Sequence, residues 1–177
     1  MEMVSDEDLM GRVSRNGDRD AASELIARYK ERAYLFALKL LGNSDDALDA
    51  SQEAFVKVFV KRSRYEQGRL FRPWFLAILR NCARDIQRST LRMRKAGGDE
   101  LVTYMADAKA DPLTAARSAQ VWRKVLQLPP KLREVIVLRH FEGLDYKEMA
   151  EVLGVPINTV ASRLHQARKK MVDDDEL

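Results

Sequence analysis

The chain has 177 residues, of which 31 are Lys or Arg and 27 are Asp or Glu, giving a formal net charge of +4, and 46% are hydrophobic. This length fits one large domain or two small ones, with enough apolar residues for packed cores. One cysteine and two histidines exclude an internal disulfide and a zinc finger. An acidic N-terminus and the lack of an apolar run of roughly 20 residues argue against a signal peptide and a membrane span. We expect a soluble cytoplasmic protein without metal or cofactor.

The charges are unevenly distributed along the chain. Residues 1–56 have a balance of −5, whereas residues 57–95 contain 12 basic and 2 acidic residues, a balance of +10. Residues 96–115 are again acidic, and residues 158–170 hold four basic residues and no acidic one. A charged run is often only a solvated helix face. Two basic blocks separated by an acidic stretch nevertheless favour contact with a nucleic acid at two places.

The first half of the chain has helical patterning. Apolar residues repeat at helical spacing over residues 22–40 and end at Gly42, a suitable residue for a helix C-terminus. The polar and acidic sequence at 43–46 predicts the N-cap of a second helix. A third helix is predicted to begin around Pro73, because proline is tolerated in a first turn. Its Trp74 has apolar neighbours, which favours a place in the core over a role in stacking on DNA.

The second half follows a change in composition. Residues 91–111 contain two adjacent glycines and no sustained apolar face, which predicts a flexible acidic linker. Helical patterning resumes after Pro112 and stops before two prolines at 129–130. No segment alternates as a strand does. We therefore predict an all-α protein with two helical domains, residues 1–90 and 112–177.

The sharpest local pattern lies over residues 146–165. Residues 146–153 predict a short helix, Gly154 a turn with positive φ, and Pro156 the opening of a second helix. This spacing is typical of a helix-turn-helix, whose second helix presents polar side chains to a DNA major groove. An ordinary pair of helices with a polar surface is the alternative. The agreement of spacing, charge and polarity favours DNA binding.

These segments resemble a known family, the bacterial RNA polymerase sigma factors of the extracytoplasmic-function (ECF) group. The segments that resemble its region 4 are residues 128–139, 141–150 and 153–168. Those that resemble its region 2 are residues 46–55 and 71–81, together with Asp85 and Arg88. The resemblance covers nearly the whole chain in the family's order. It implies a non-enzymatic initiation factor that binds core RNA polymerase, directs it to promoters and assists DNA melting.

The resemblance also implies protein partners. A shared helix face is expected to dock on the clamp coiled coil of the polymerase largest subunit through Asp49, Gln52 and Glu53. The flap of the second-largest subunit is a further expected contact, and an anti-sigma factor is the expected regulator. Ser51 stands where the family usually has an apolar residue, which leaves the local packing open.

Two sets of promoter-binding residues follow from the resemblance. The set expected at the −10 element, where a loop pocket would hold a flipped base and basic residues would grip the backbone, is Arg64, Tyr65, Gln67, Arg69, Asn81, Arg84 and Arg88. The set expected at the −35 element is Asn158, Thr159, Ser162, Arg163, Gln166, Arg168 and Lys170. Ala161 and Gln166 stand where many members have a basic residue. They imply either weaker phosphate binding or a different base preference.

Other functions remain open from the sequence. A stand-alone regulator would bind duplex DNA without polymerase, often as a dimer, but a sensing domain has no need for the positive charge of residues 57–95. An enzyme acting on nucleic acid would need paired carboxylates or a nucleophile–base pair, and the acids show no such cluster. The chain could also act chiefly as the partner of an anti-sigma factor. The acidic linker either threads the basic channels of the polymerase or only keeps the domains soluble.

Overall fold

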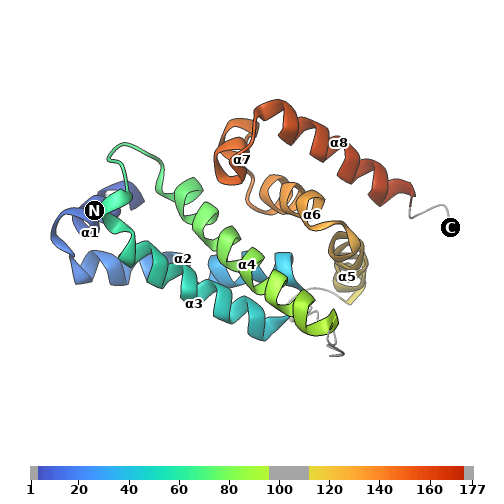
Figure 1. Cartoon of the computed structure of the whole chain (residues 1–177), viewed down its shortest axis with the longest axis horizontal. Coiled ribbons are helices and arrows are strands. Elements are labelled where there is room, and N and C mark those ends of the chain that lie inside the picture. Colours follow the sequence, from blue (N-terminus) through green and yellow to red (C-terminus); the bar gives the residue numbers. More distant parts are fainter. Residues whose placement is uncertain (1–3, 96–111, 174–177) are drawn as a thin grey trace.

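The computed structural model of the chain describes residues 4–95 and 112–173, and within them all regular secondary structure is helical (Figure 1). This confirms the prediction of an all-α fold with two helical domains. Most of the predicted linker, residues 96–111, lies outside the described residues.

The N-terminal bundle is built from four helices and one short 3₁₀ turn. They are α1 (Asp6–Asn16), α2 (Arg19–Leu41), α3 (Ser44–Val60), η1 (Arg62–Arg64) and α4 (Phe71–Lys95). Helices α2, α3 and α4 pack against one another around buried aromatic side chains, among them Phe36, Phe71 and Phe75. Trp74 is also buried, as predicted. These rings provide much of the apolar area that stabilises the bundle.

Local signals in the sequence account for most of the helix ends. Gly42 ends α2 with a φ of +75°, and the Asn43 side chain accepts hydrogen bonds from the backbone N–H groups of Asp45 and Asp46, each at 2.9 Å. Helix α4 continues to Lys95, five residues beyond the predicted domain boundary at residue 90. The residues of its last turn are Leu, Arg, Met and Lys, all strong helix formers.

The C-terminal bundle begins at Pro112 and contains the predicted helix-turn-helix. Its elements are α5 (Pro112–Gln127), α6 (Pro130–Ile136), the π-helical segment η2 (Val137–Phe141), α7 (Tyr146–Leu153) and α8 (Ile157–Asp173). Buried side chains from α6, α7 and α8 include Val135, Met149 and Leu164. This core holds α7 and α8 in one orientation.

The two bundles pack directly against each other. Helix α7 lies on α4, and both α5 and α6 contact α2 (Figure 1). We call this contact region between the two bundles the seam. Arg133 of α6 reaches across it and donates to the backbone carbonyl of Leu40 at the end of α2. The contact therefore joins elements that lie far apart in the sequence.

Candidate nucleic-acid interface

The turn between α7 and α8 has the geometry that the helix-turn-helix pattern predicts. Gly154 has a φ of +64°, a left-handed conformation that glycine adopts without steric cost. Asp145 caps α7 by accepting from the Glu148 N–H at 2.8 Å, and the Glu148 carboxylate accepts from the Asp145 N–H at 2.9 Å. This reciprocal cap fixes the start of α7.

Helix α8 separates a buried face from a polar one. Val160, Leu164 and Ala167 are buried against the rest of the bundle. At 100° per residue, Asn158, Ser162 and Gln166 lie opposite this buried side, and Thr159, Arg163 and Lys170 lie along one flank between the two. These six predicted −35 residues are all exposed or half-buried. Such a face suits the hydrogen-bonding edges of a major groove.

Arg168 is the exception among the predicted −35 residues. The helical period puts it on the flank of α8 opposite Arg163 and Lys170. The charges of Arg168 and Arg139, after burial, lower the pKa of His140, so this flank is the one nearer η2. Sequence reasoning missed its neighbour Lys169, which is exposed and seven residues after Ser162. That spacing of two helical turns, which the sequence already contains, puts Lys169 on the polar face.

The predicted −10 residues of α4 form a stripe beside the seam. Asn81 and Arg88 are exposed, and Arg88 lies 3.6 Å from Asp85. Arg84 is half-buried, and its Nε atom lies 3.7 Å from Glu134 of α6. The outer part of this stripe is open to a ligand, whereas its inner edge contacts the other bundle.

The loop of residues 61–70, between α3 and α4, holds the other predicted −10 residues. Arg64 and Gln67 are exposed, but Tyr65 is only 5% exposed and its ring packs against Trp74 at 5.2 Å. Its hydroxyl donates to the backbone carbonyl of Arg69, and burial raises its pKa to about 12. The expectation that Tyr65 faces a flipped base is therefore corrected. It supports the loop from beneath, because its ring completes the aromatic core.

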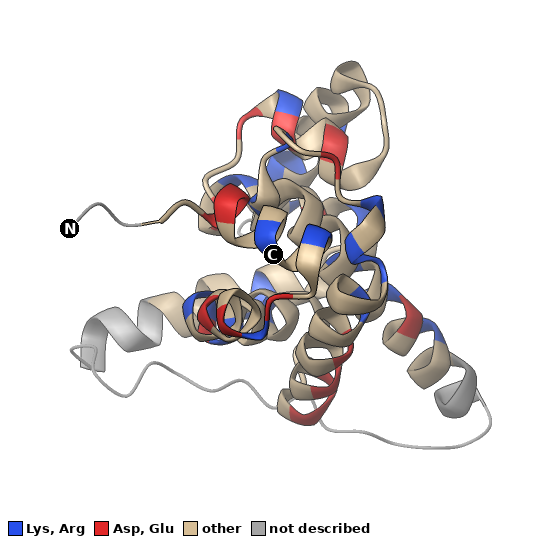
Figure 2. Ribbon diagram, turned by 90° about the vertical axis from the view of Figure 1, so that its left-hand side faces the viewer, with Lys and Arg blue, Asp and Glu red and all other residues tan. Residues whose placement is uncertain are grey.

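Acidic side chains of the C-terminal bundle pair with basic side chains of the N-terminal bundle along the seam. Figure 2 marks the positions of acidic and basic residues on the ribbons of both bundles. Glu134 is almost fully buried and lies 2.9 Å from Arg80. Glu142, also buried, lies 2.7 Å from Arg32 and 3.4 Å from Arg72. The basic partners of Glu134 and Glu142 come from α2 and α4. These pairs thus neutralise part of the basic block at residues 57–95.

The loop takes part in the same seam. The Nε atom of Arg69 lies 2.6 Å from the Glu151 carboxylate of α7, and both side chains are about one-third exposed. Two predicted −10 residues, Arg69 and Arg84, are thus paired with acids of the other bundle in this conformation. Sequence reasoning missed these partners, since nothing local links residues more than 45 positions apart.

The seam also contains an aromatic contact. The rings of Trp122 and Phe141 stack with centroids 4.5 Å apart, and the Lys39 ammonium lies 4.6 Å from the Phe141 centroid. Burial lowers the pKa of Lys39. This cation–π contact joins α2 to α5 and η2.

The predicted polymerase-docking residues lie on the exposed face of α3. Asp49, Gln52 and Glu53 are all exposed, although Glu53 also lies 3.4 Å from Lys57. The same face carries exposed apolar side chains that sequence reasoning did not single out, namely Leu48, Val56 and Val60. The four-residue spacing of Val56 and Val60 is the signal that could have found these two. An apolar strip flanked by acids is typical of a protein-binding surface.

The N-terminal bundle buries the side chains of Ser51 and Cys82. The Ser51 hydroxyl donates to the Leu48 carbonyl at 2.8 Å, so the polar group is satisfied where the family usually has an apolar residue. Burial raises the pKa of the Cys82 thiol and makes it less reactive.

Two negative findings apply to residues 4–95 and 112–173. No group of three or more His, Cys, Asp or Glu side chains there could hold a metal ion. None of the helices in these ranges has the length and apolar character needed to cross a bilayer.

Comparison with known proteins places these surfaces in a family context. The profile of sigma-70 region 2 matches residues 25–93, and that of sigma-70 region 4 matches residues 118–171. The chain is 31% identical over 172 residues to the ECF RNA polymerase sigma factor SigW of Bacillus subtilis, covering 89% of this chain and 90% of SigW. It is 27% identical over 181 residues to the ECF RNA polymerase sigma-E factor of Escherichia coli K12, covering 95% and 93%.

A solved structure resembles the chain over both bundles. CnrH, determined in complex with the cytosolic domain of CnrY, has a TM-score of 0.73 and 26% sequence identity, and the match covers 97% of each chain. The similarity thus extends over the N-terminal and C-terminal bundles together.

Proposed function

The chain belongs to the ECF group of RNA polymerase sigma factors, the initiation factors that direct polymerase to promoters, and we propose how its surfaces divide that work. Residues 1–90 bind core polymerase and the −10 element, residues 91–111 connect the domains, and residues 112–177 bind the −35 element. The observation that carries this proposal is the polar face of α8, opposite a fully buried one.

The exposed face of α3 binds the polymerase. Asp49, Gln52 and Glu53 provide charge and hydrogen bonds for a basic partner such as the clamp coiled coil, while Val56 and Val60 provide apolar area. The flap of the second-largest subunit is a second contact of the chain. The protein contributes binding and DNA melting to initiation, without chemistry of its own.

Promoter DNA binds to α8 and to the α4 side of the N-terminal bundle. On α8, Ser162 and Arg163 are the foremost candidates for contact with −35 bases, because Arg reads guanine with two hydrogen bonds. At the −10 element the candidates are Arg64, Gln67, Arg69, Asn81, Arg84 and Arg88, which grip backbone and unstacked bases.

The two bundles separate when both elements are bound. The −10 and −35 elements are about 25 base pairs apart, roughly 85 Å at 3.4 Å per base pair. Here Arg69 and Arg84 lie 2.6 Å and 3.7 Å from acids of the C-terminal bundle. Those pairs must break before the two arginines contact DNA, since one side chain cannot hold both partners.

An anti-sigma factor regulates the chain. The support is the match over both bundles to CnrH, a protein solved with the cytosolic domain of CnrY bound. A partner that holds the bundles together would keep Arg69 and Arg84 paired with acids and away from DNA.

The proposal is tested by capture of purified bacterial core RNA polymerase, followed by run-off transcription on a promoter library. Capture with sequence-selected transcripts supports it. No capture, with binding to duplex DNA alone, would indicate a stand-alone regulator instead.

One variant tests the docking face directly. Asp49→Arg reverses a charge at an exposed position and should lower the affinity for core polymerase at least roughly a hundredfold, since like charges in an interface cost several kcal/mol. Glu31→Arg is the matched control, because Glu31 is exposed on α2, outside the docking face. Unchanged polymerase binding by Asp49→Arg would exclude α3 as the docking surface.

A further inference from the structure

Helix α1 contacts both ends of the loop formed by residues 61–70. At the start of the loop, the Ser14 hydroxyl donates to the Arg62 carbonyl at 2.8 Å. At the end of the loop, the Glu7 carboxylate accepts from the backbone N–H of Phe71 at 3.0 Å. The two bonds come from opposite ends of one helix, so α1 spans the loop like a brace.

The bond from Glu7 caps the helix that follows the loop. Phe71 is the first residue of α4, and its N–H has no acceptor within that helix. A carboxylate satisfies this donor and interacts favourably with the positive end of the helix dipole. Glu7 therefore acts as an N-cap supplied by another helix, 64 residues away in the sequence.

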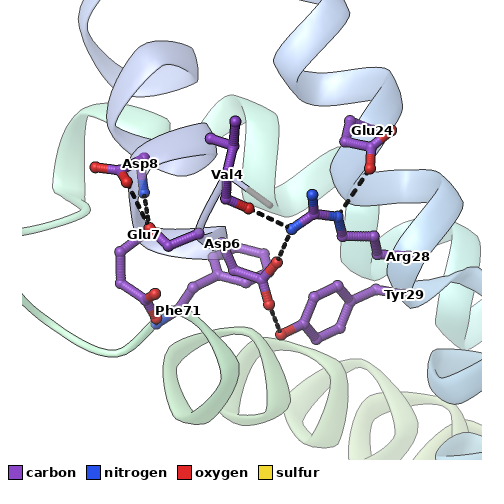
Figure 3. Close-up of polar contacts among 9 residues, drawn as sticks. Val4, Asp6, Glu7, Asp8, Glu24, Arg28, Tyr29 and Phe71 are labelled. Atoms are coloured by element: carbon purple, nitrogen blue, oxygen red, sulfur yellow. Dashed lines mark hydrogen bonds and ion pairs between the residues drawn. The ribbon is translucent and has the colours of Figure 1, made fainter. Parts of the chain in front are cut away.

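Helix α1 is itself held firmly against α2 (Figure 3). The Asp6 carboxylate accepts from the Tyr29 hydroxyl at 2.5 Å and from Arg28 at 2.8 Å, and Arg28 also donates to the Val4 carbonyl at 2.8 Å. Burial and the nearby Asp6 raise the pKa of Tyr29, so its phenol stays protonated and continues to donate. The position of α1 is thus set by several polar contacts.

The same anchor reaches the start of α4. The Tyr29 ring meets the Phe71 ring edge-on, with centroids 5.1 Å apart and an interplanar angle of 86°. Tyr29 therefore orients both α1 and the residue that Glu7 caps. Between the two braced ends, Tyr65 supports the loop from beneath, while Arg64 and Gln67 remain exposed.

We propose that Glu7 and Ser14 are positioning residues for −10 recognition, which brace the loop so that its exposed side chains are already arranged for an unstacked base. This inference rests on the proposed function of the loop. A preformed loop loses less conformational entropy when it binds, and small displacements of contacting groups reduce selectivity strongly. Neither residue needs to touch DNA.

The test compares the double variant Glu7→Ala/Ser14→Ala with the wild-type full-length chain, each with core polymerase. The wild type first selects a promoter from a library randomised in both elements. Transcription from that promoter is then compared with versions altered only in the −10 or only in the −35 element. We expect −10 discrimination to fall roughly tenfold, with −35 discrimination and polymerase affinity unchanged. Glu7→Gln, which keeps an acceptor for the Phe71 N–H, should recover most of the loss of Glu7→Ala.

Ser5→Ala is the matched control. Ser5 caps α1 by accepting from the Asp8 N–H at 3.0 Å, and none of its described hydrogen bonds reaches the loop. Its loss therefore weakens α1 without removing a brace, and −10 discrimination should stay at the wild-type value. Thermal unfolding of all variants verifies that they are folded at the assay temperature.

The outcomes separate this inference from the function on which it rests. If the wild-type chain selects no promoter, the proposed function fails. If the wild type selects a promoter and the double variant discriminates −10 sequences equally well, the brace alone is refuted. An equal loss from Ser5→Ala would also refute it, because general weakening of α1 would then explain the effect.

Discussion

The two surfaces proposed to bind DNA differ in their contacts with the rest of the molecule. On α8 the polar face is open, and its residues from Asn158 to Lys170 are exposed or half-buried. On α4 and its preceding loop, Arg69 and Arg84 are paired with Glu151 and Glu134 of the other bundle. Both surfaces are basic, so the difference does not come from composition. The proposed −35 surface is therefore open in this conformation, whereas two arginines of the proposed −10 surface stay paired until the bundles separate.

The largest expected effect is that of Glu134→Gln, which should separate the two bundles and remove the difference between the two surfaces. Glu134 is 3% exposed and Arg80 6%, and breaking such a buried pair costs about 3–5 kcal/mol because the remaining charge is left without its partner. The Arg80 guanidinium becomes hydrated when the bundles separate, so the loss of its buried partner should shift the equilibrium toward separated bundles. Small-angle X-ray scattering should then give a larger radius of gyration.

Glu31→Gln is the control for this variant, since it removes a carboxylate that is exposed on α2. Opening should also increase the affinity of the free chain for single-stranded −10 DNA. An unchanged radius of gyration together with an unchanged thermal midpoint would mean that the buried pair does not hold the bundles together.

Arg163→Ala tests whether α8 recognises the −35 element through this arginine. If Arg163 contacts a base, its loss should reduce discrimination among −35 sequences by about 1–3 kcal/mol and leave −10 discrimination intact. The measurement is competitive transcription from promoters that differ only in the −35 element. Lys147→Ala removes an equal charge from an exposed position on α7 and should leave the preference unchanged. Full retention of −35 selectivity by Arg163→Ala would remove Arg163 from the reading face.

Lys169→Ala tests the extent of the polar face. A phosphate contact contributes about 0.9 to the slope of log affinity against log salt concentration, so the variant should bind −35 DNA more weakly and with a slope that is lower by about that amount. Arg168→Ala is the control next to it, because Arg168 lies on the side of α8 toward His140. A larger change from Arg168→Ala than from Lys169→Ala would reverse our placement of the two side chains.

Glu151→Gln should have the smallest effect. Its pair with Arg69 is about one-third exposed on both sides, and such surface pairs contribute about 0–1 kcal/mol. We expect nearly unchanged compactness, with a slight increase in −10 binding at low salt that disappears at high salt. Opening as large as that of Glu134→Gln would show that the loop contact, and not the buried pair, controls the seam.

The amino-acid sequence by itself determined the helices, their caps and the helix-turn-helix. Gly42, Asn43 and Gly154 act on neighbouring residues only, so their effect can be read from local order. The separation of buried and polar faces on α8 is equally local, because it follows from the helical period. The one N-terminal helix that was missed, α1, is short, and its apolar face of Leu9, Met10 and Val13 is brief enough to escape notice among acidic residues.

Only the tertiary structure decided which basic residues pair with the other bundle. Arg84 and Arg88 are one helical turn apart and identical in type, yet Arg84 meets Glu134 of α6 while Arg88 stays exposed beside Asp85 of its own helix. Tyr65 sits in a polar loop, but its ring is drawn into the aromatic core by Trp74 and Phe71. Burial and ion pairing depend on what the fold brings alongside a side chain, and those partners come from distant parts of the chain. Residue type and spacing cannot encode that choice, because the same arginine or tyrosine is stable in either setting.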